Sequence, residues 1–275
     1  HHGGIMCNGF VKDWSEAQVY SVQHGKGSNG HRSRMNAEWV AGPPTMTEEE
    51  LGANRNNFYE DCLARKLDTD EYWQSRMPDW NKVKVPMLST ANWGGQGLHP
   101  RGNFEGFTQS ASNDKWLEVH GREHWSEFYT DYGREMQLAF FDHFLKGENN
   151  GWQDRRRVQL QVRHKDKFVE RFEDAWPIPS TQWTKFYLQA DGHGLTEASG
   201  EQAATVSYRG FSEGVTFLSA PLEAEAEITG PIAAKLFVSS STVDADMFLV
   251  FRVFDASFRE VTFQGALDPH TPIAQ

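Results

Sequence analysis

Three short motifs carry residue types and spacings that could do chemistry. The first, residues 210–214, spells the G-x-S-x-G pattern of a serine nucleophile. Such a serine must lie between a strand and a helix, so that its hydroxyl projects at the edge of a sheet. Here strand-like alternation both precedes and follows the motif, at residues 205–208 and 215–218. We therefore interpret the motif as a hairpin loop and do not assign Ser212 as a nucleophile.

The second motif, residues 120–124, spells H-x-x-E-H. As a zinc site it would need a helix, because a helix brings two imidazoles four residues apart onto one face. His120 instead ends a candidate strand and Gly121 follows at once, so the two rings are expected to point in different directions. No third ligand is identifiable, and we predict no metal and no other cofactor. Loss of activity on chelation would favour a zinc hydrolase instead.

The third pattern consists of two strand ends. A candidate buried strand at residues 83–89 leads into a Gly-rich turn at 93–97, and a second strand at 115–119 leads into a loop that carries His124. Sites in open α/β sheets form at the carboxyl ends of strands. An imidazole on such a loop can act as a general base, because its ordinary pKa lies near neutrality. His124 is therefore our candidate base.

The elements that must position these residues change in character along the chain. Residues 1–80 have the composition of helices and loops, and Thr47 with Glu50 has the spacing of a capping box that opens a helix including Leu51, Phe58 and Cys62. Residues 81–150 alternate strand, helix, strand and helix, which predicts a parallel sheet with crossovers. The last of these helices is expected over 131–146, with Leu138, Phe141 and Leu145 on its apolar face.

Residues 151–275 change to a period of two. Val158, Leu160 and Val162 alternate with polar neighbours, and similar runs recur at 206–208, 222–228, 232–238 and 247–254. Turn residues separate the runs. Many short strands at this spacing predict an antiparallel sandwich.

Composition narrows the class of protein. The chain has 275 residues, a net charge of −11 and 13% aromatic residues, which argues against disorder and against a nucleic-acid partner. No apolar run is long enough to span a membrane, and no secretory signal opens the chain. Cys7 and Cys62 fit two free thiols in a reducing compartment, so we expect a cytoplasmic protein.

Five stretches together resemble a known family. The resemblance is to the cocaine-esterase and X-prolyl dipeptidyl-peptidase group of α/β-hydrolases, and it covers nearly the whole chain. The order and spacing of the stretches carry it. They are residues 85–88 with 93–99, residues 121–125, residues 140–147, residues 230–234 and residues 244–247.

This resemblance implies a fold that is α/β plus all-β: a partial α/β-hydrolase sheet with a helical cap, followed by a β jelly-roll sandwich. Residues 1–80 would be the cap region, 81–150 the C-terminal part of the hydrolase domain, and 151–275 an incomplete jelly roll. The family's nucleophile elbow lies upstream of the cap. The resemblance therefore implies that the serine lies on a missing N-terminal segment and that this piece alone is inactive.

The resemblance also assigns roles to single residues. His124 matches the family's catalytic histidine, which takes the proton from serine and returns it to the leaving group. The family's acid falls at Gly95 or Gln96, where this sequence departs from the pattern, because glutamine cannot offset the charge of an imidazolium. Glu105 is a second position for the acid, although by itself it fits a solvated helix carboxylate.

Trp93, His99 and Trp125 are candidate pocket-lining residues. Aromatic side chains there would suit an apolar acyl or aryl group, and packing between cap and sheet would explain them equally well.

The resulting hypothesis is a serine hydrolase of carboxylic esters or amides, which acts on small ester or peptide substrates. An X-prolyl dipeptidyl peptidase of the same fold stays open. That activity needs an anion for a free α-amino group, but the acidic run at 48–50 resembles first-turn helix charges. A non-enzymatic binding module also stays open, with Trp176 and Trp183 as candidate contacts.

Overall fold

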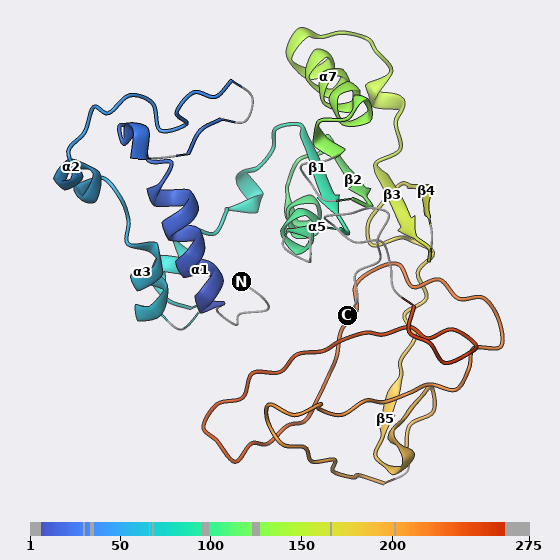
Figure 1. Ribbon diagram of the computed structural model, residues 1–275. Coiled ribbons are helices and arrows are strands. Elements are labelled where there is room, and N and C mark those ends of the chain that lie inside the picture. The colour runs from blue at the N-terminus through green and yellow to red at the C-terminus, as the bar shows by residue number, and fades with distance from the viewer. Residues whose placement is uncertain are drawn as a thin grey trace. The chain divides into compact units, whose positions relative to one another are not determined.

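The structure is a computed structural model (Figure 1). It describes residues 7–29, 31–33, 36–65, 67, 69–94, 99–122, 127–165, 167–200 and 202–261. Three predicted site residues, Gln96, His124 and Trp125, lie outside these ranges. The chain divides into two compact units, residues 1–78 with 240–248 and residues 79–239 with 249–275.

The first unit is helical. Its helices are α1 (Asn8–Trp14), which continues as a π-helical turn, α2 (Glu48–Ala53), α3 (Phe58–Ala64) and α4 (Glu71–Gln74). The predicted capping box is present: the Thr47 hydroxyl accepts from the Glu50 amide at 3.2 Å, and the Glu50 carboxylate accepts from the Thr47 amide at 2.8 Å.

The single helix expected from Thr47 through Cys62 is instead two helices. Asn54 ends α2, and its side-chain amide donates to the Glu50 carbonyl at 2.9 Å. Three asparagines stand between residues 54 and 57, and their side chains compete with the helix for backbone groups. Leu51 of α2 and Cys62 of α3 are still both buried.

The second unit is built on a mixed sheet with the order β1-β2-β3-β4. The strands are β1 (Met87–Asn92), β2 (Lys115–His120), β3 (Val158–Arg163) and β4 (Phe168–Glu173). β1–β2 and β2–β3 are parallel, and β3–β4 is antiparallel. α5 (Pro100–Gln109) connects β1 to β2, and α7 (Asp131–Lys146) lies between β2 and β3 in the chain. The predicted order of strand, helix, strand and helix is confirmed.

β1 begins later than expected. Pro86 has no N–H to donate to a ladder, whereas the Met87 amide donates to the Asp114 carbonyl at 2.8 Å and so starts the pairing. Val85, which we placed inside the strand, is exposed.

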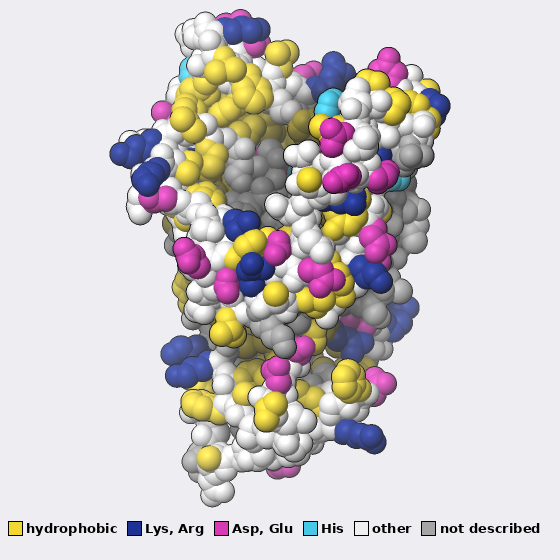
Figure 2. Space-filling view, turned by 90° about the vertical axis from the view of Figure 1, so that its left-hand side faces the viewer, with side chains coloured by type: hydrophobic (Ala, Val, Ile, Leu, Met, Phe, Trp, Pro, Cys, Tyr) yellow, Lys and Arg dark blue, Asp and Glu magenta, His cyan; other side chains and the backbone are white. Residues whose placement is uncertain are grey.

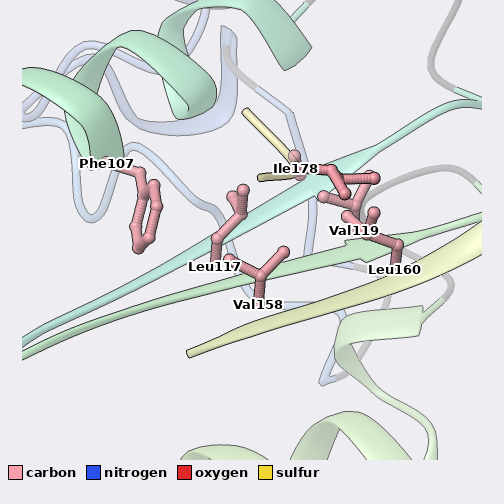
Figure 3. Close-up of a cluster of buried hydrophobic side chains, with 7 residues drawn as sticks. Phe107, Leu117, Val119, Val158, Leu160 and Ile178 are labelled. Atoms are coloured by element: carbon pink, nitrogen blue, oxygen red, sulfur yellow. The ribbon is translucent and has the colours of Figure 1, made fainter. Parts of the chain in front are cut away.

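The core lies on both faces of the sheet. On one face, Leu117 and Val119 of β2 pack with Val158 and Leu160 of β3, Phe107 of α5 and Ile178 (Figure 3). On the other, Trp116 of β2 packs with Met136 and Phe140 of α7 and with Trp152. Successive side chains of β2 therefore enter two hydrophobic clusters on opposite faces of the sheet, as expected for a strand covered on both sides.

α7 has the predicted bounds but turns a different face to the sheet. Its buried residues are Met136 and Phe140, whereas Leu138, Phe141 and Leu145 are exposed. Both sets have helical spacing, so periodicity alone could not choose between them. Trp116 and Trp152 decide it, because they contact the Phe140 side.

β3 joins a different sheet from the one expected. We placed Val158, Leu160 and Val162 at the start of the sandwich, but β3 extends the parallel sheet beside β2. Alternation predicts that one face is buried and leaves open which strand lies alongside.

The jelly-roll sandwich is not confirmed. After β4, the described residues form a two-stranded antiparallel sheet, β5 (Tyr187–Gln189) with β6 (Gly194–Thr196), and isolated bridges at Gly194–Leu218 and Phe254–Glu260. The runs at 206–208, 222–228, 232–238 and 247–254 form no ladder. Their apolar side chains stay exposed, as at Phe237. An alternating pattern specifies an apolar face but not the partner strand that would cover it.

Acidic and basic side chains are interspersed on the face shown in Figure 2, with hydrophobic side chains exposed among them. Within the described part of the chain, none of the helices combines the length and apolar character needed to cross a bilayer.

Candidate active site

The candidate site begins where β1 and β2 end. Asn92 and His120 are partners in the parallel register, and the Trp93 amide donates to the His120 carbonyl at 2.9 Å, which extends the pairing one residue beyond the strands. The segments that lead toward Gln96 and His124 therefore leave the sheet side by side, at the carboxyl edge where α/β sheets bind ligands.

Two glycines allow these segments to approach closely. A Cβ on Gly94 would lie 2.7 Å from the Gly121 carbonyl oxygen and 2.8 Å from the Arg122 carbonyl carbon, and a Cβ on Gly121 would collide with the Phe168 ring of β4. Real Cβ atoms do not approach so closely. Both positions therefore require glycine for packing reasons.

Gln161 of β3 holds both segments. Its backbone carbonyl accepts from the Trp93 indole at 2.8 Å, and its side-chain oxygen accepts from the Gly121 amide at 2.8 Å. Sequence reasoning missed this residue because it assigned β3 to a separate domain.

The described candidates lie as follows. Trp93 is half-buried and stacks on Phe104 of α5 at 5.6 Å, and Phe104 stacks on Trp176 at 4.5 Å. His99 precedes α5 at its N-cap and is exposed. Glu105 is exposed on α5, where its carboxylate accepts from the Gln109 amide. The structure does not bring Glu105 to the strand ends through any described contact.

A buried polar group that the sequence did not single out lies beside His120. The Glu118 carboxylate contacts the His120 Nδ1 at 2.9 Å and accepts from the Tyr132 hydroxyl at 3.1 Å. Glu118 is 3% exposed and His120 4%. Residues 116, 118 and 120 share the β2 face toward α7, so the i, i+2 spacing of Glu118 and His120 was the available signal.

The surroundings of Tyr132 and the contact of Glu118 define how this group is arranged. Burial, together with the adjacent Glu118 carboxylate, raises the pKa of the Tyr132 phenol well above its ordinary value, so the hydroxyl stays a donor. The Glu118 carboxylate contacts the Nδ1 atom of His120, so the imidazole is held through that nitrogen and not through Nε2. That Nε2 is buried and has no hydrogen-bond partner. A carboxylate-oriented imidazole with an open Nε2 has the form of a general base.

Neither of the other two motifs forms a catalytic arrangement among the described residues. Ser212 lies in a turn, where its hydroxyl donates to the Arg209 carbonyl at 2.6 Å and accepts from the Gly214 amide at 3.3 Å, and no helix follows. In the H-x-x-E-H motif, His120 is engaged with Glu118, and Glu123 and His124 lie outside the described ranges. The described residues hold no group of three metal-ligating side chains.

Two family models and a curated relative match this chain. Residues 1–126 match the family model X-Pro dipeptidyl-peptidase (S15 family), and residues 150–272 match the X-Pro dipeptidyl-peptidase C-terminal non-catalytic domain. The cocaine esterase of Rhodococcus sp. (strain MB1 Bresler) is 30% identical over 40% of this chain and 26% of its own length. The chain belongs to the cocaine-esterase and X-Pro dipeptidyl-peptidase family.

Solved structures of the same family support the fold. Two crystal structures of a CocE/NonD family hydrolase from Staphylococcus aureus match at 38% identity with a TM-score of 0.51, over 55% of this chain and 28% of theirs. This chain thus spans about a quarter of the length of the relatives it matches. The family is one of hydrolases, and the mixed sheet is consistent with part of an α/β-hydrolase fold.

The first match ends and the second begins inside the second unit, with residues 127–149 between them. The first model covers both strand ends, and the second begins at residue 150, just before β3. Gln161 and Phe168, which contact the strand-end segments, belong to the second matched region, as does Trp176, which stacks on Phe104.

Proposed function

We propose that this chain contributes the histidine base of a serine hydrolase that cleaves carboxylic esters or amides. One observation carries the proposal: the ends of β1 and β2 are fixed together by the Trp93–His120 hydrogen bond and by the Gly94–Gly121 contact. The segment after Gly121 carries His124. Family membership supports hydrolysis as the reaction class.

In the proposed mechanism, the Nε2 atom of His124 takes the proton of a serine hydroxyl and returns it to the leaving alcohol or amine. The serine is proposed to lie upstream, as the family resemblance implies. The chain covers only 26% and 28% of the relatives, which leaves room for a further segment. Of the two positions open for the acid, Gln96 is the fourth residue after the end of β1 in the sequence. Glu105 is exposed, and its carboxylate already accepts from the Gln109 amide. Gln96 would orient the imidazole without offsetting its charge.

The Glu118–His120 pair provides a second imidazole near the same edge, and the test must separate the two. In the native gene product that contains this chain, His124→Ala should lower kcat/KM for 4-nitrophenyl butyrate by about 10²–10⁴-fold. His120→Gln should retain most activity. His164→Ala, which changes an exposed histidine between β3 and β4, is the matched control. If His120→Gln alone lowered kcat/KM, the general base would be His120 with Glu118, and the proposal would be contradicted.

The position of the nucleophile is tested by covalent labelling. A fluorophosphonate reacts with activated serines, and we expect intact mass to show no adduct on the 275-residue chain. An adduct that disappears in Ser212→Ala would place the nucleophile in this chain and overturn the upstream assignment.

An ester is proposed ahead of an X-prolyl peptide as the substrate. Glu50 in the acidic run of α2 is engaged in the capping box, and the Thr47 hydrogen bonds lower the pKa of its carboxyl. Its carboxylate is already hydrogen-bonded at the start of α2, so we do not assign it to bind an α-amino group. Faster turnover of Ala-Pro-4-nitroanilide than of 4-nitrophenyl butyrate would favour the peptidase.

The binding-module alternative is weaker, because Trp176 is stacked on Phe104 and only Trp183 of that pair is exposed. Polysaccharide binding that persists in His124→Ala would favour it. Cys7 and Cys62 are both free thiols, which supports the proposal of a cytoplasmic location.

A further inference from the structure

A cavity of about 370 Å³ lies within the first unit. This is the size of pockets that hold small organic molecules. Its walls come from the π-helical turn that follows α1 (Ser15–Tyr20), from the connection between α2 and α3, and from α4 with the turn after it. The cavity therefore belongs to one compact unit and needs no contribution from the mixed sheet.

Hydrogen bonds between different elements hold these walls together. The Gln23 side-chain amide, which lies just after the π-helical turn, donates to the Leu51 carbonyl of α2 at 2.8 Å. The Tyr72 hydroxyl of α4 donates to the Asp61 carboxylate of α3 at 3.3 Å. Because each bond joins residues far apart in the sequence, the cavity is a feature of the folded unit.

The charges that line the cavity are all positive. Among the described lining residues, the only ionised groups are the guanidinium groups of Arg55 and Arg76. Arg55 is half-buried and Arg76 is exposed, so a ligand can reach both. Neither forms an ion pair with any described residue. Arginine keeps its charge at any pH at which a protein is folded, so an anion is the favoured occupant.

Aromatic rings fix both guanidinium groups. The Arg55 Cζ atom lies 4.7 Å from the centroid of the Tyr20 ring, and the Arg76 Cζ atom lies 3.4 Å from that of the Tyr72 ring. The Nη1 atom of Arg76 also donates to the Tyr72 carbonyl at 2.8 Å. A guanidinium group that stacks through its face keeps N–H groups at its edge, where a carboxylate can accept two of them in parallel.

Arg65 shows how an arginine of this unit behaves when a carboxylate is close. It lies over the same Tyr72 ring, at 4.3 Å, and pairs with Asp61 at 2.8 Å and with Asp70 at 3.8 Å. Among the described residues, the fold thus provides carboxylates for one arginine on this ring and none for Arg76. A bound carboxylate would supply the missing counter-charge.

The rest of the wall favours a ligand that also has an apolar part. Val19 and Phe58 line the cavity and are 40% and 36% exposed. A molecule in the cavity would cover these side chains, and burial of apolar surface favours binding. Inorganic phosphate has no apolar part, whereas a carboxylate on an aryl or short alkyl group has both required features.

We infer that this cavity binds a small carboxylate with an aryl or short alkyl group. The guanidinium groups of Arg55 and Arg76 hold the carboxylate, and Val19 and Phe58 contact the apolar part. The site shares no residue with the strand ends proposed for catalysis, and the inference does not depend on hydrolase activity.

The experiment is a calorimetric titration of benzoate into the native gene product that contains this chain, at low ionic strength. We expect saturable binding of benzoate. Benzyl alcohol, which lacks the charge, and inorganic phosphate, which lacks the ring, should each bind at least about tenfold more weakly. This comparison needs no substitution, so it tests the inference even where a variant fails to fold.

Substitutions then locate the site. Arg55→Gln and Arg76→Gln should each weaken benzoate binding by at least about tenfold, because each removes a charged donor. Arg76→Lys, which keeps the charge but not the planar fork, should give an intermediate affinity. Arg32→Gln is the matched control and should leave the affinity unchanged, because Arg32 also lies over an aromatic ring, at 3.7 Å, but does not line the cavity.

The inference is wrong if benzoate shows no saturable binding up to about 10 mM, or if benzyl alcohol or phosphate binds as tightly as benzoate. Equal losses in Arg32→Gln and Arg76→Gln would also overturn it, by showing a general effect of charge. Benzoate that binds at the strand ends instead would be insensitive to Arg55→Gln and Arg76→Gln, which would contradict the assigned site. None of these readouts requires turnover, so failure of the proposed hydrolase leaves this test intact.

Discussion

At the scale of single residues, the clearest feature is a carboxylate enclosed between strand and helix. Glu118 lies inside the second unit with one oxygen on Tyr132 and the other on His120. Removing one partner of such a group leaves a buried acceptor unsatisfied, which costs more than the hydrogen bond contributes. Stability should therefore respond strongly to this polar cluster.

The tyrosine provides a direct test. We expect Tyr132→Phe to lower the free energy of unfolding by about 1–3 kcal/mol, measured by urea denaturation. Tyr129→Phe, which changes an exposed tyrosine three residues away, should shift it by less than about 0.5 kcal/mol. Equal effects of the two changes would mean that Glu118 does not need the hydroxyl.

The same tyrosine predicts a dependence on pH. Because the folded state raises the pKa of Tyr132, its contribution to stability is complete below the unfolded pKa of about 10 and is lost as the pH rises beyond it. The loss should be at most about 1.4 kcal/mol per pH unit. The measurement is the difference in urea midpoint between the unmodified chain and Tyr132→Phe from about pH 8 to 11, which should narrow above about pH 10. A constant difference would contradict the raised pKa.

At the scale of elements, the segments after β1 and β2 can lie close together only because Gly94 and Gly121 have no side chain. Gly121→Ala should destabilise the second unit by about 1–3 kcal/mol, because the new methyl group meets the Phe168 ring. Phe168→Leu in the same chain should recover part of the loss, and a double-mutant cycle measures that coupling. Gly102→Ala on α5 has open space around it and should stabilise by up to about 1 kcal/mol.

α7 offers a matched pair of neighbours. Phe140 is 7% exposed and Phe141 is 51% exposed. Phe140→Ala should cost about 3–5 kcal/mol in unfolding free energy, and Phe141→Ala should cost much less. The reverse order would mean that the face predicted from the sequence, with Leu138, Phe141 and Leu145, is the buried one.

These elements also mark how far sequence reasoning reaches. Local signals predicted the capping box at Thr47, the order of strands and helices from β1 to α7, and the bounds of α7, because each depends on residues close in the chain. The buried face of α7, the partner of β3 and the roles of Gln161 and Glu118 depend on residues far apart in sequence. For the site, the strand ends were predictable from pattern, whereas Gln96, His124 and Trp125 stay predictions.

At the scale of the whole chain, hydrogen exchange separates two kinds of segment. Amides of β2 are paired on both sides by β1 and β3, whereas residues 232–238 form no ladder. We expect β2 amides to exchange slowest and those of 232–238 to exchange orders of magnitude faster. Strong protection across 222–238 would instead support the sandwich that the alternating pattern favoured.

The position of Gln161 has a consequence for modularity. The region that matches a domain described as non-catalytic begins at residue 150. Its first strand nevertheless extends the mixed sheet beside β2, and Gln161 hydrogen-bonds to the segments on which the proposed chemistry depends. The start of this matched region therefore does not coincide with a boundary between the two compact units, because residues 79–239 belong to one unit. A chimera of two family members that exchanges halves at residue 150 would separate Gln161 from Trp93 and Gly121. A crossover placed after Glu173 keeps them together.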